Sequence, residues 1–129
     1  MPADDAYVHV AEFRSALRRF LRQSETVARR AGLTPQRYLL LLMVKGAPDG
    51  SETSTVTELS ERLQLAQSTV TELVGRAEHL GLLLRRPSEI DGRVAHVCLT
   101  EEGERRLALA FTTLETQRDI LRSAVLDLE

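Results

Sequence analysis

Residues 55–80 read TVTELSERLQLAQSTVTELVGRAEHL and contain two amphipathic segments separated by three residues. The first begins at Thr55, which can form a capping box with Glu58, and it presents Leu59 and Leu63 on one side. The second repeats apolar residues at helical spacing until Gly81 ends it. These residues are Val70, Leu73, Val74, Ala77 and Leu80. Two short helices joined by a three-residue turn are typical of a helix-turn-helix.

After this pair of helices the apolar spacing changes to one that favours strands. Residues 82–86 and 94–99 are predicted to be strands, and Asp91 and Gly92 between them supply the turn of a hairpin. A hairpin in this position is a wing. The sequence therefore predicts a winged helix-turn-helix with a small antiparallel β wing.

Long helical patterns precede this unit. Residues 10–28 carry apolar side chains at helical spacing, and Gly32 can close that helix in a left-handed conformation. Thr34 and Pro35 then begin a second helix. Its run of apolar residues at 39–44 covers all sides, so we expect other elements to enclose this helix.

A last helix follows the wing. Thr100 can cap it, and the apolar pattern continues for about 28 residues, which corresponds to roughly 42 Å. One side presents a row of apolar residues that we expect to form a dimer interface, because a small winged domain cannot cover them all. The row contains Leu107, Phe111, Leu114, Leu121, Val125 and Leu128.

The two ends of the chain carry opposite charge. Residues 1–46 hold eight basic and four acidic side chains, whereas residues 101–129 hold four basic and seven acidic ones. Because the charges are complementary, we expect the last helix to pack against the first helix of the same subunit or of a second one. The fold class that we predict is mainly α, with long N- and C-terminal dimerisation helices around the winged unit.

Composition limits the remaining possibilities. The chain of 129 residues fits a single domain, and an aromatic content of 4% disfavours a sandwich or barrel of many short strands. The longest apolar run, residues 39–44, is too short to span a membrane, and the acidic start of the chain is unlike a secretion signal. Cys98 is the single cysteine, which excludes an internal disulfide. We expect a cytoplasmic protein with no membrane partner.

Several motifs, and their order, resemble the MarR family of bacterial transcriptional regulators. The most specific are GLLLRR at 81–86, DGR at 91–93 and LTEEG at 99–103, and VTELSERL at 56–63 and QSTVTELV at 67–74 are similar to the family's two short helices. The resemblance covers residues 10–125. It implies one MarR-type domain over residues 1–129, in which residues 54–99 form the DNA-binding lobe. Residues 6–46 and 100–129 would form the helical dimerisation and core part.

Three departures from the family accompany the resemblance. Gln64 occupies a turn position where the family commonly has glycine, so a left-handed conformation there would be unfavourable by about a kcal/mol. Ala66 stands where a serine N-cap is usual. The sequence ends at Glu129, where the family usually adds a further short helix.

The resemblance and the polar side chains of the winged unit give a set of candidate DNA-binding residues. Glutamine can pair with adenine and arginine with guanine, and Arg93 at the hairpin tip could enter a minor groove with Asp91 orienting it. Ordinary surface charges are the alternative, and Glu72 could instead pair with Arg76. The candidates are Thr55, Thr57, Gln67, Ser68, Thr69, Thr71, Glu72, Arg76, Arg85, Arg86, Asp91 and Arg93.

The predicted function is that of a sequence-specific regulator, most simply a repressor. It would bind double-stranded DNA at a pseudo-palindromic operator as a homodimer, with release by a small-molecule effector, as the family implies. The alternative is a heterodimer partner that sequesters another regulator without binding DNA itself. The sequence does not identify an effector site.

Other chemistry is poorly supported. His96 and Cys98 lie two residues apart on one predicted strand, so they project in parallel and lack a third orienting group for catalysis. We therefore expect no enzyme activity, although a redox role of Cys98 stays open. The three histidines, His9, His79 and His96, have no spacing typical of metal ligands, so we expect no metal and no cofactor.

Overall fold

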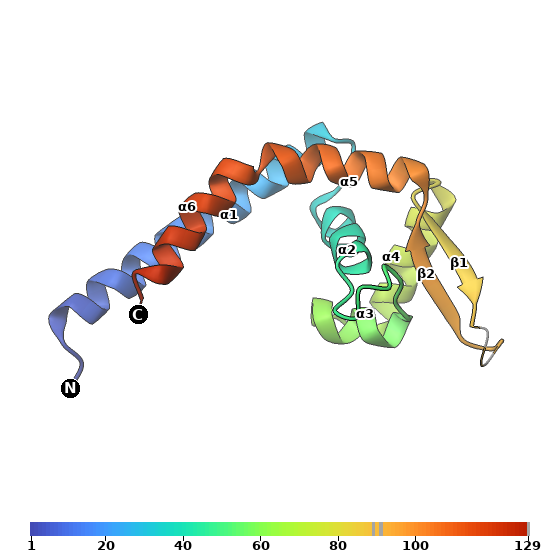
Figure 1. Cartoon of the computed structure of the whole chain (residues 1–129), viewed down its shortest axis with the longest axis horizontal. Helices are drawn as coiled ribbons and strands as arrows, with labels where there is room; N and C mark the ends of the chain where they lie inside the picture. Colours follow the sequence, from blue (N-terminus) through green and yellow to red (C-terminus); the bar gives the residue numbers. More distant parts are fainter. Residues whose placement is uncertain (89, 91, 129) are drawn as a thin grey trace.

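The computed structural model describes residues 1–88, 90 and 92–128. It is mainly helical with one two-stranded antiparallel sheet, as the sequence predicts (Figure 1). In chain order the elements are α1 (Asp4–Arg30), α2 (Pro35–Lys45), α3 (Val56–Leu63), α4 (Gln67–His79), β1 (Leu83–Pro87), β2 (Ala95–Leu99), α5 (Glu101–Thr113) and α6 (Glu115–Leu126). In the described part of the chain, none of the helices is long and apolar enough to cross a membrane.

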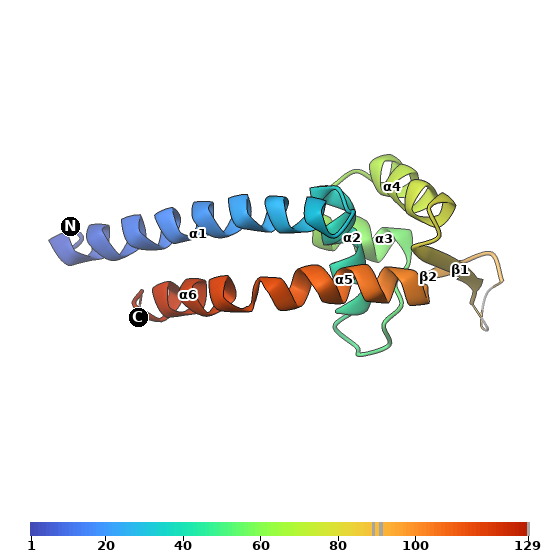
Figure 2. The ribbon, with the colours of Figure 1, turned by 90° about the horizontal axis from the view of Figure 1, so that it is seen from above.

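The elements form a lobe and an arm (Figures 1 and 2). The lobe consists of α2, α3, α4, the β1–β2 hairpin and α5, and the arm consists of α1 and α6 packed side by side. The lobe has a continuous apolar core to which each of its elements contributes. Its largest fully buried side chains are Leu40, Leu41, Val44, Leu59, Val70, Val74, Leu82, Leu83 and Val97. In contrast, no side chain of α6 is fully buried, so the arm has little core of its own.

The junction between α1 and α2 forms as predicted. Gly32 has a φ of 79°, and the N–H of Leu33 donates to the carbonyl of Ala28 at 2.9 Å, which closes α1. Thr34 caps α2 by accepting a hydrogen bond from the N–H of Arg37 at 3.1 Å.

The expectation that α2 is enclosed on all sides is wrong. Leu40, Leu41 and Val44 are fully buried, but Leu39 is 41% exposed. Helices α1, α3, α4 and α5 and strand β2 all contact α2, but the side that carries Leu39 reaches solvent.

Local chemistry fixes the helix-turn-helix. The capping box is complete, because the N–H of Glu58 donates to the Thr55 hydroxyl at 3.2 Å and the N–H of Thr55 donates to the Glu58 carboxylate at 2.9 Å. Gln64 adopts the left-handed conformation that its position in the turn suggested, with a φ of 56°. Ala66 precedes α4 and supplies no side-chain cap for the first amides of that helix.

The wing is a regular antiparallel pair in which Leu83 lies opposite Leu99 and Pro87 opposite Ala95. A further contact was not predicted: Ser54 pairs with Val97 through hydrogen bonds of 3.1 and 2.8 Å. This bridge ties the loop before α3 to the wing. The predicted turn residue Asp91 lies outside the described residues.

The expectation of a single last helix is wrong, because the chain breaks at Leu114 between α5 and α6. The hydroxyls of Thr112 and Thr113 donate back to the carbonyls of Ala108 and Leu109. Such bonds from threonine side chains to the preceding turn often bend helices. Figure 1 shows the chain bending between α5 and α6, and α6 packs along α1.

The apolar row of this segment therefore does not lie on one surface. Leu107 and Leu114 are 4% and 0% exposed and belong to the core of the chain itself, so their expected place in a dimer interface is corrected. Leu121 is half-buried on α6. Phe111, Val125 and Leu128 are each at least 40% exposed, together with three other residues of this segment. These further residues are Leu109, Ile120 and Leu126.

Candidate nucleic-acid interface

Helix α4 has one buried and one exposed side. Val70, Val74 and Ala77 are fully buried against the lobe core and fix the rotation of the helix. The opposite side is polar and open to solvent. Its exposed candidates are Gln67, Ser68, Thr71, Glu72 and Arg76, whereas Thr69 is half-buried.

Helices α3 and α4 are joined by polar contacts at the start of α4. The amide of Gln67 donates to the hydroxyl of Thr57 at 3.3 Å, so these two candidates form one polar surface. Thr55 is half-buried, and its hydroxyl accepts the capping hydrogen bond of α3. The structure therefore gives Thr55 a capping role and leaves Thr57 and Gln67 on the surface.

An arginine that sequence reasoning missed holds α3 in place. Arg62 donates to the carbonyl of Met43 at 2.7 Å and to the hydroxyl of Ser54 at 2.5 Å. Ser54 is fully buried and paired with Val97, so Arg62 connects α3, the end of α2 and the wing. This network fixes the hairpin relative to the helix-turn-helix.

Glu72 and Arg76 of α4 are not paired with each other. Among the described residues, no ion pair joins Glu72 to Arg76, so the alternative of a restraining pair is not realised. Both side chains line a shallow hollow of about 480 Å³ between α4 and the start of α2. Its lining also includes Arg37, Gly75, His79 and Leu80.

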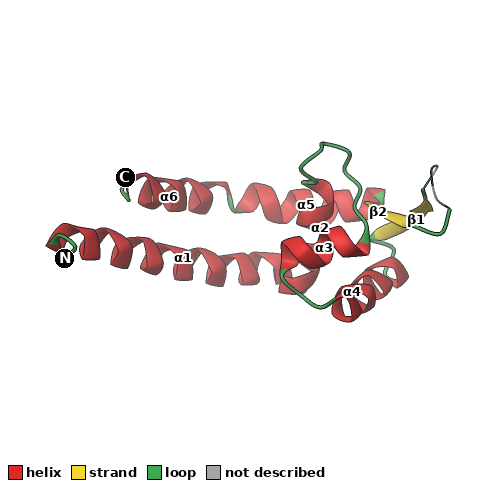
Figure 3. Ribbon diagram, turned by 90° about the horizontal axis from the view of Figure 1, so that it is seen from below, coloured by secondary structure: helices red, strands yellow, loops and turns green. Residues whose placement is uncertain are grey.

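The wing arginines differ in their surroundings. Arg85 is paired with Glu78 of α4, with 3.1 Å between Nε and the carboxylate, so this side chain braces the wing against α4. Its role as a candidate DNA-binding residue stays a prediction. Arg86 lies opposite His96 in the sheet and is exposed, and Arg93 is exposed next to the turn. Figure 3 shows the hairpin at the end of the lobe remote from the arm.

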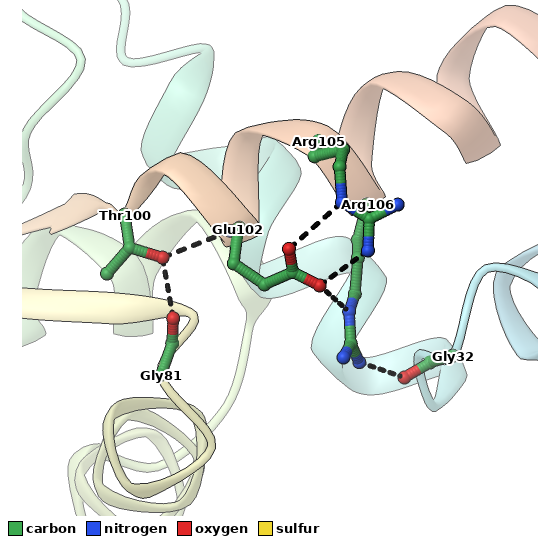
Figure 4. Close-up of polar contacts among 7 residues, drawn as sticks. Gly32, Gly81, Thr100, Glu102, Arg105 and Arg106 are labelled. Atoms are coloured by element: carbon green, nitrogen blue, oxygen red, sulfur yellow. Dashed lines mark hydrogen bonds and ion pairs between the residues drawn. The ribbon is translucent and has the colours of Figure 1, made fainter.

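The start of α5 joins the wing to the rest of the chain (Figure 4). The Thr100 hydroxyl donates to the carbonyl of Gly81 at 2.6 Å and accepts from the N–H of Gly103 at 3.0 Å. One turn later, Arg106 donates to the carbonyl of Gly32 at 3.1 Å. The wing base and the α1–α2 junction are thus attached to successive turns at the start of α5.

Glu102 forms ion pairs with Arg105 and Arg106 near the start of α5. Hydrogen bonds from Arg105 and then from Arg106 lower the pKa of Glu102 from an ordinary 4.5 to about 2. A carboxylate with a depressed pKa contributes stability above its unfolded-state pKa and loses that contribution as the pH falls through its folded-state pKa. The ion pairs of Glu102 with Arg105 and Arg106 are therefore complete near neutral pH, and they weaken only between about pH 4.5 and 2.

A second hollow lies between α2 and α5. It has a volume of about 370 Å³, and Lys45 and Glu104, 2.9 Å apart, lie at its edge. Its remaining lining is apolar and consists of Leu42, Gly46, Leu107, Ala108 and Phe111. Behind it, the guanidinium of Arg118 stacks 3.7 Å from the ring centroid of Phe111. Sequence reasoning had not found this hollow, because its lining comes from two helices about 60 residues apart.

The structure also places the residues that were considered for catalysis and metal binding. His96 and Cys98 are both half-buried on β2 and project from the same face of the hairpin. In the part of the chain that the structure describes, no cluster of histidine, cysteine and carboxylate side chains could hold a metal ion.

The helix-turn-helix, the hairpin and the exposed polar side of α4 define a winged helix-turn-helix protein. Residues 31–94 match the model of the MarR family. The chain is 34% identical over 86 residues to the organic hydroperoxide resistance transcriptional regulator of Bacillus subtilis, a match that covers 67% of this chain but only 56% of that regulator. It is 29% identical over 120 residues to the uncharacterized HTH-type transcriptional regulator YsmB of the same organism, covering 89% of this chain and 80% of YsmB.

A mutant MarR from E. coli complexed with operator DNA has the same fold, with a TM-score of 0.68, 18% identity and coverage of 90% of this chain and 79% of that one. The chain belongs to the MarR family. This is a family of transcriptional regulators with a DNA-binding fold, not of enzymes.

Proposed function

We propose that this chain regulates transcription by binding a pseudo-palindromic operator as a homodimer, and that it represses by occupying that site. The observation that carries the proposal is the polar, exposed side of α4 next to a braced hairpin with exposed arginines. Residues 54–99 serve as the DNA-binding part in this proposal. The E. coli MarR of the same fold, described above, was solved with operator DNA.

The dimensions of the lobe suit a DNA groove. Helix α4 has 13 residues and is therefore about 20 Å long, and the major groove admits one α-helix. Figure 1 shows the hairpin extending beyond α4, so the exposed Arg93 can reach an adjacent minor groove, where the negative potential attracts arginine. Residues 54–100 carry five basic and six acidic side chains, so one lobe attracts phosphates weakly and two lobes are needed for tight binding.

The arm supplies a surface for a second copy. Its exposed apolar residues lie on both helices, and a two-helix arm without its own core leaves them in water unless another chain covers them. These residues are Tyr7, Val8, Val10 and Leu21 of α1, and Ile120, Val125, Leu126 and Leu128 at and beyond α6. A second arm of the same sequence would cover this surface and give the dimer a two-fold axis.

Replacement of Arg93 by alanine tests the role of the wing. We expect operator affinity to fall by about 1 kcal/mol or more, because a groove contact of arginine is lost, while the melting temperature stays nearly unchanged. Fluorescence anisotropy with a labelled operator measures the first quantity and thermal denaturation the second. The matched control is Arg105→Ala, which removes the same charge from α5, where Arg105 pairs with Glu102. Equal losses from both variants would mean that total charge, rather than the wing, determines binding.

The α2–α5 hollow is the site that we propose for a small effector. It is largely apolar, with a cation and a carboxylate at one edge, which suits a compact ligand with one polar end. A ligand there contacts both the lobe helix α2 and α5, so it could change the spacing of two recognition helices in a dimer. We expect some members of a phenolic-acid screen to raise the melting temperature and weaken operator binding, and Ala108→Trp to abolish both effects. Ligands that act equally on that variant would place the site elsewhere.

A further inference from the structure

The outward side of α4 contains a glycine that folding does not explain. Gly75 lies within the helix, its φ is not positive, and a Cβ added there would meet no heavy atom within 4 Å. Glycine is unfavourable inside a helix because it loses more backbone freedom than alanine does on folding. Neither backbone geometry nor packing within the chain therefore requires glycine at this position. Glycine is also the residue that lets a helix backbone approach a ligand closely.

Glu72 lies three residues before Gly75 and thus on the same side of the helix. Its side chain is exposed, and among the described residues no arginine, lysine or histidine forms an ion pair with it. A carboxylate on a surface that meets DNA is repelled by the phosphates. Such a residue is compatible with binding where it accepts a hydrogen bond from a base.

We propose that Gly75 marks the closest approach of α4 to the floor of the major groove and that Glu72 reads a cytosine in each half-site. The inference rests on the proposed function, and it adds the chemistry of the base that is read. The exposed Ser68 lies four residues before Glu72, so the contact surface continues towards the start of the helix.

The choice of base follows from hydrogen-bonding capacity. An ionised carboxylate only accepts hydrogen bonds. In the major groove, guanine presents N7 and O6 and thymine presents O4, which are all acceptors. Adenine offers its N6 amino group next to the acceptor N7, whereas cytosine offers its N4 amino group without a neighbouring acceptor of its own. Cytosine is therefore the base that fits Glu72.

The first test is selection of binding sites from random duplexes by the full chain and its variants. We expect the wild-type protein to enrich a pseudo-palindrome with a cytosine at one position of each half-site. Glu72→Gln should change that preference to adenine by about tenfold, because glutamine pairs with N6 and N7 of adenine. Glu72→Ala should remove the preference at this position alone. The matched control is Glu115→Gln, which makes the same substitution at the exposed start of α6. This variant should enrich the same site as the wild-type protein.

The second test separates contact with DNA from folding. Gly75→Ala should raise the melting temperature by about 3 °C, because alanine favours the helix, and should weaken operator binding by about tenfold or more, because the added Cβ stands between helix and groove. If Gly75 served folding alone, its replacement by alanine would not raise the melting temperature and weaken operator binding at the same time.

The outcomes distinguish the two proposals. If the wild-type chain enriches no sequence, the proposed function itself fails. If it enriches a site that both Glu72 variants select unchanged, or if Gly75→Ala keeps full affinity, the function stands and this inference is overturned.

Discussion

Replacement of Gly103 by alanine is expected to destabilise the fold by about 3 kcal/mol or more, one of the two largest effects that the structure predicts. A Cβ at this position would overlap the backbone carbonyl of Leu82, which cannot move freely. That carbonyl accepts the N–H of Thr100 at 3.0 Å, and Leu82 itself is fully buried. Either the wing base or the first turn of α5 must therefore shift.

Urea denaturation followed by circular dichroism measures this loss. The matched control is Gly75→Ala, the same substitution within a helix but in open space, which should instead stabilise the fold by about 0.5–1 kcal/mol. If Gly103→Ala were as stable as the wild-type protein, the close packing of α5 on the wing base would be wrong.

Replacement of Val125 by glutamate should separate the proposed dimer into monomers. Val125 is 44% exposed in the single chain, so the substitution leaves the core of the chain intact. In the dimer it would place two carboxylates in an apolar interface, near Leu126 and Leu128, where neither has a partner. We expect the dissociation constant to rise by about a thousandfold.

Sedimentation equilibrium measures the oligomeric state of this variant. Gln36→Glu adds the same charge at an exposed position of α2 and should leave the dimer unchanged. A dimeric Val125→Glu protein would place the interface elsewhere. A wild-type chain that is monomeric alone but associates with another regulator would favour the heterodimer alternative.

Local features of this fold were predictable, because neighbouring residues determine them. The caps at Thr34 and Thr55 and the left-handed turn residues Gly32 and Gln64 all depend on chemistry within a few positions of the chain. The buried side of α4 follows in the same way from helical spacing. Its exposed polar side, and so most of the candidate interface, was therefore predicted from the sequence.

Features that depend on contacts between distant segments were not predictable in this way. The apolar spacing of Leu107 and Leu114 is compatible with either a dimer interface or a core, and only the packed lobe places them inside. The break at Leu114 follows two threonines whose hydroxyls bond back to the preceding turn, and apolar periodicity does not reveal it. The pairing of Arg85 with Glu78 required the position of the hairpin relative to α4.

The role of Gly103 also depends on a contact between distant segments, so the sequence alone did not predict it. The sequence marked it as part of a motif, and the structure supplies the reason, which is its contact with the carbonyl of Leu82.

The central claim, sequence-specific binding by a dimer, is tested most directly by titrating the wild-type chain against its selected operator and a scrambled duplex at several salt concentrations. We predict at least about a thousandfold preference for the operator and two chains per duplex. The logarithm of the affinity should fall linearly with the logarithm of the salt concentration, by roughly 0.9 per phosphate contact. Equal affinity for the two duplexes, or an affinity that is independent of salt, would contradict the account.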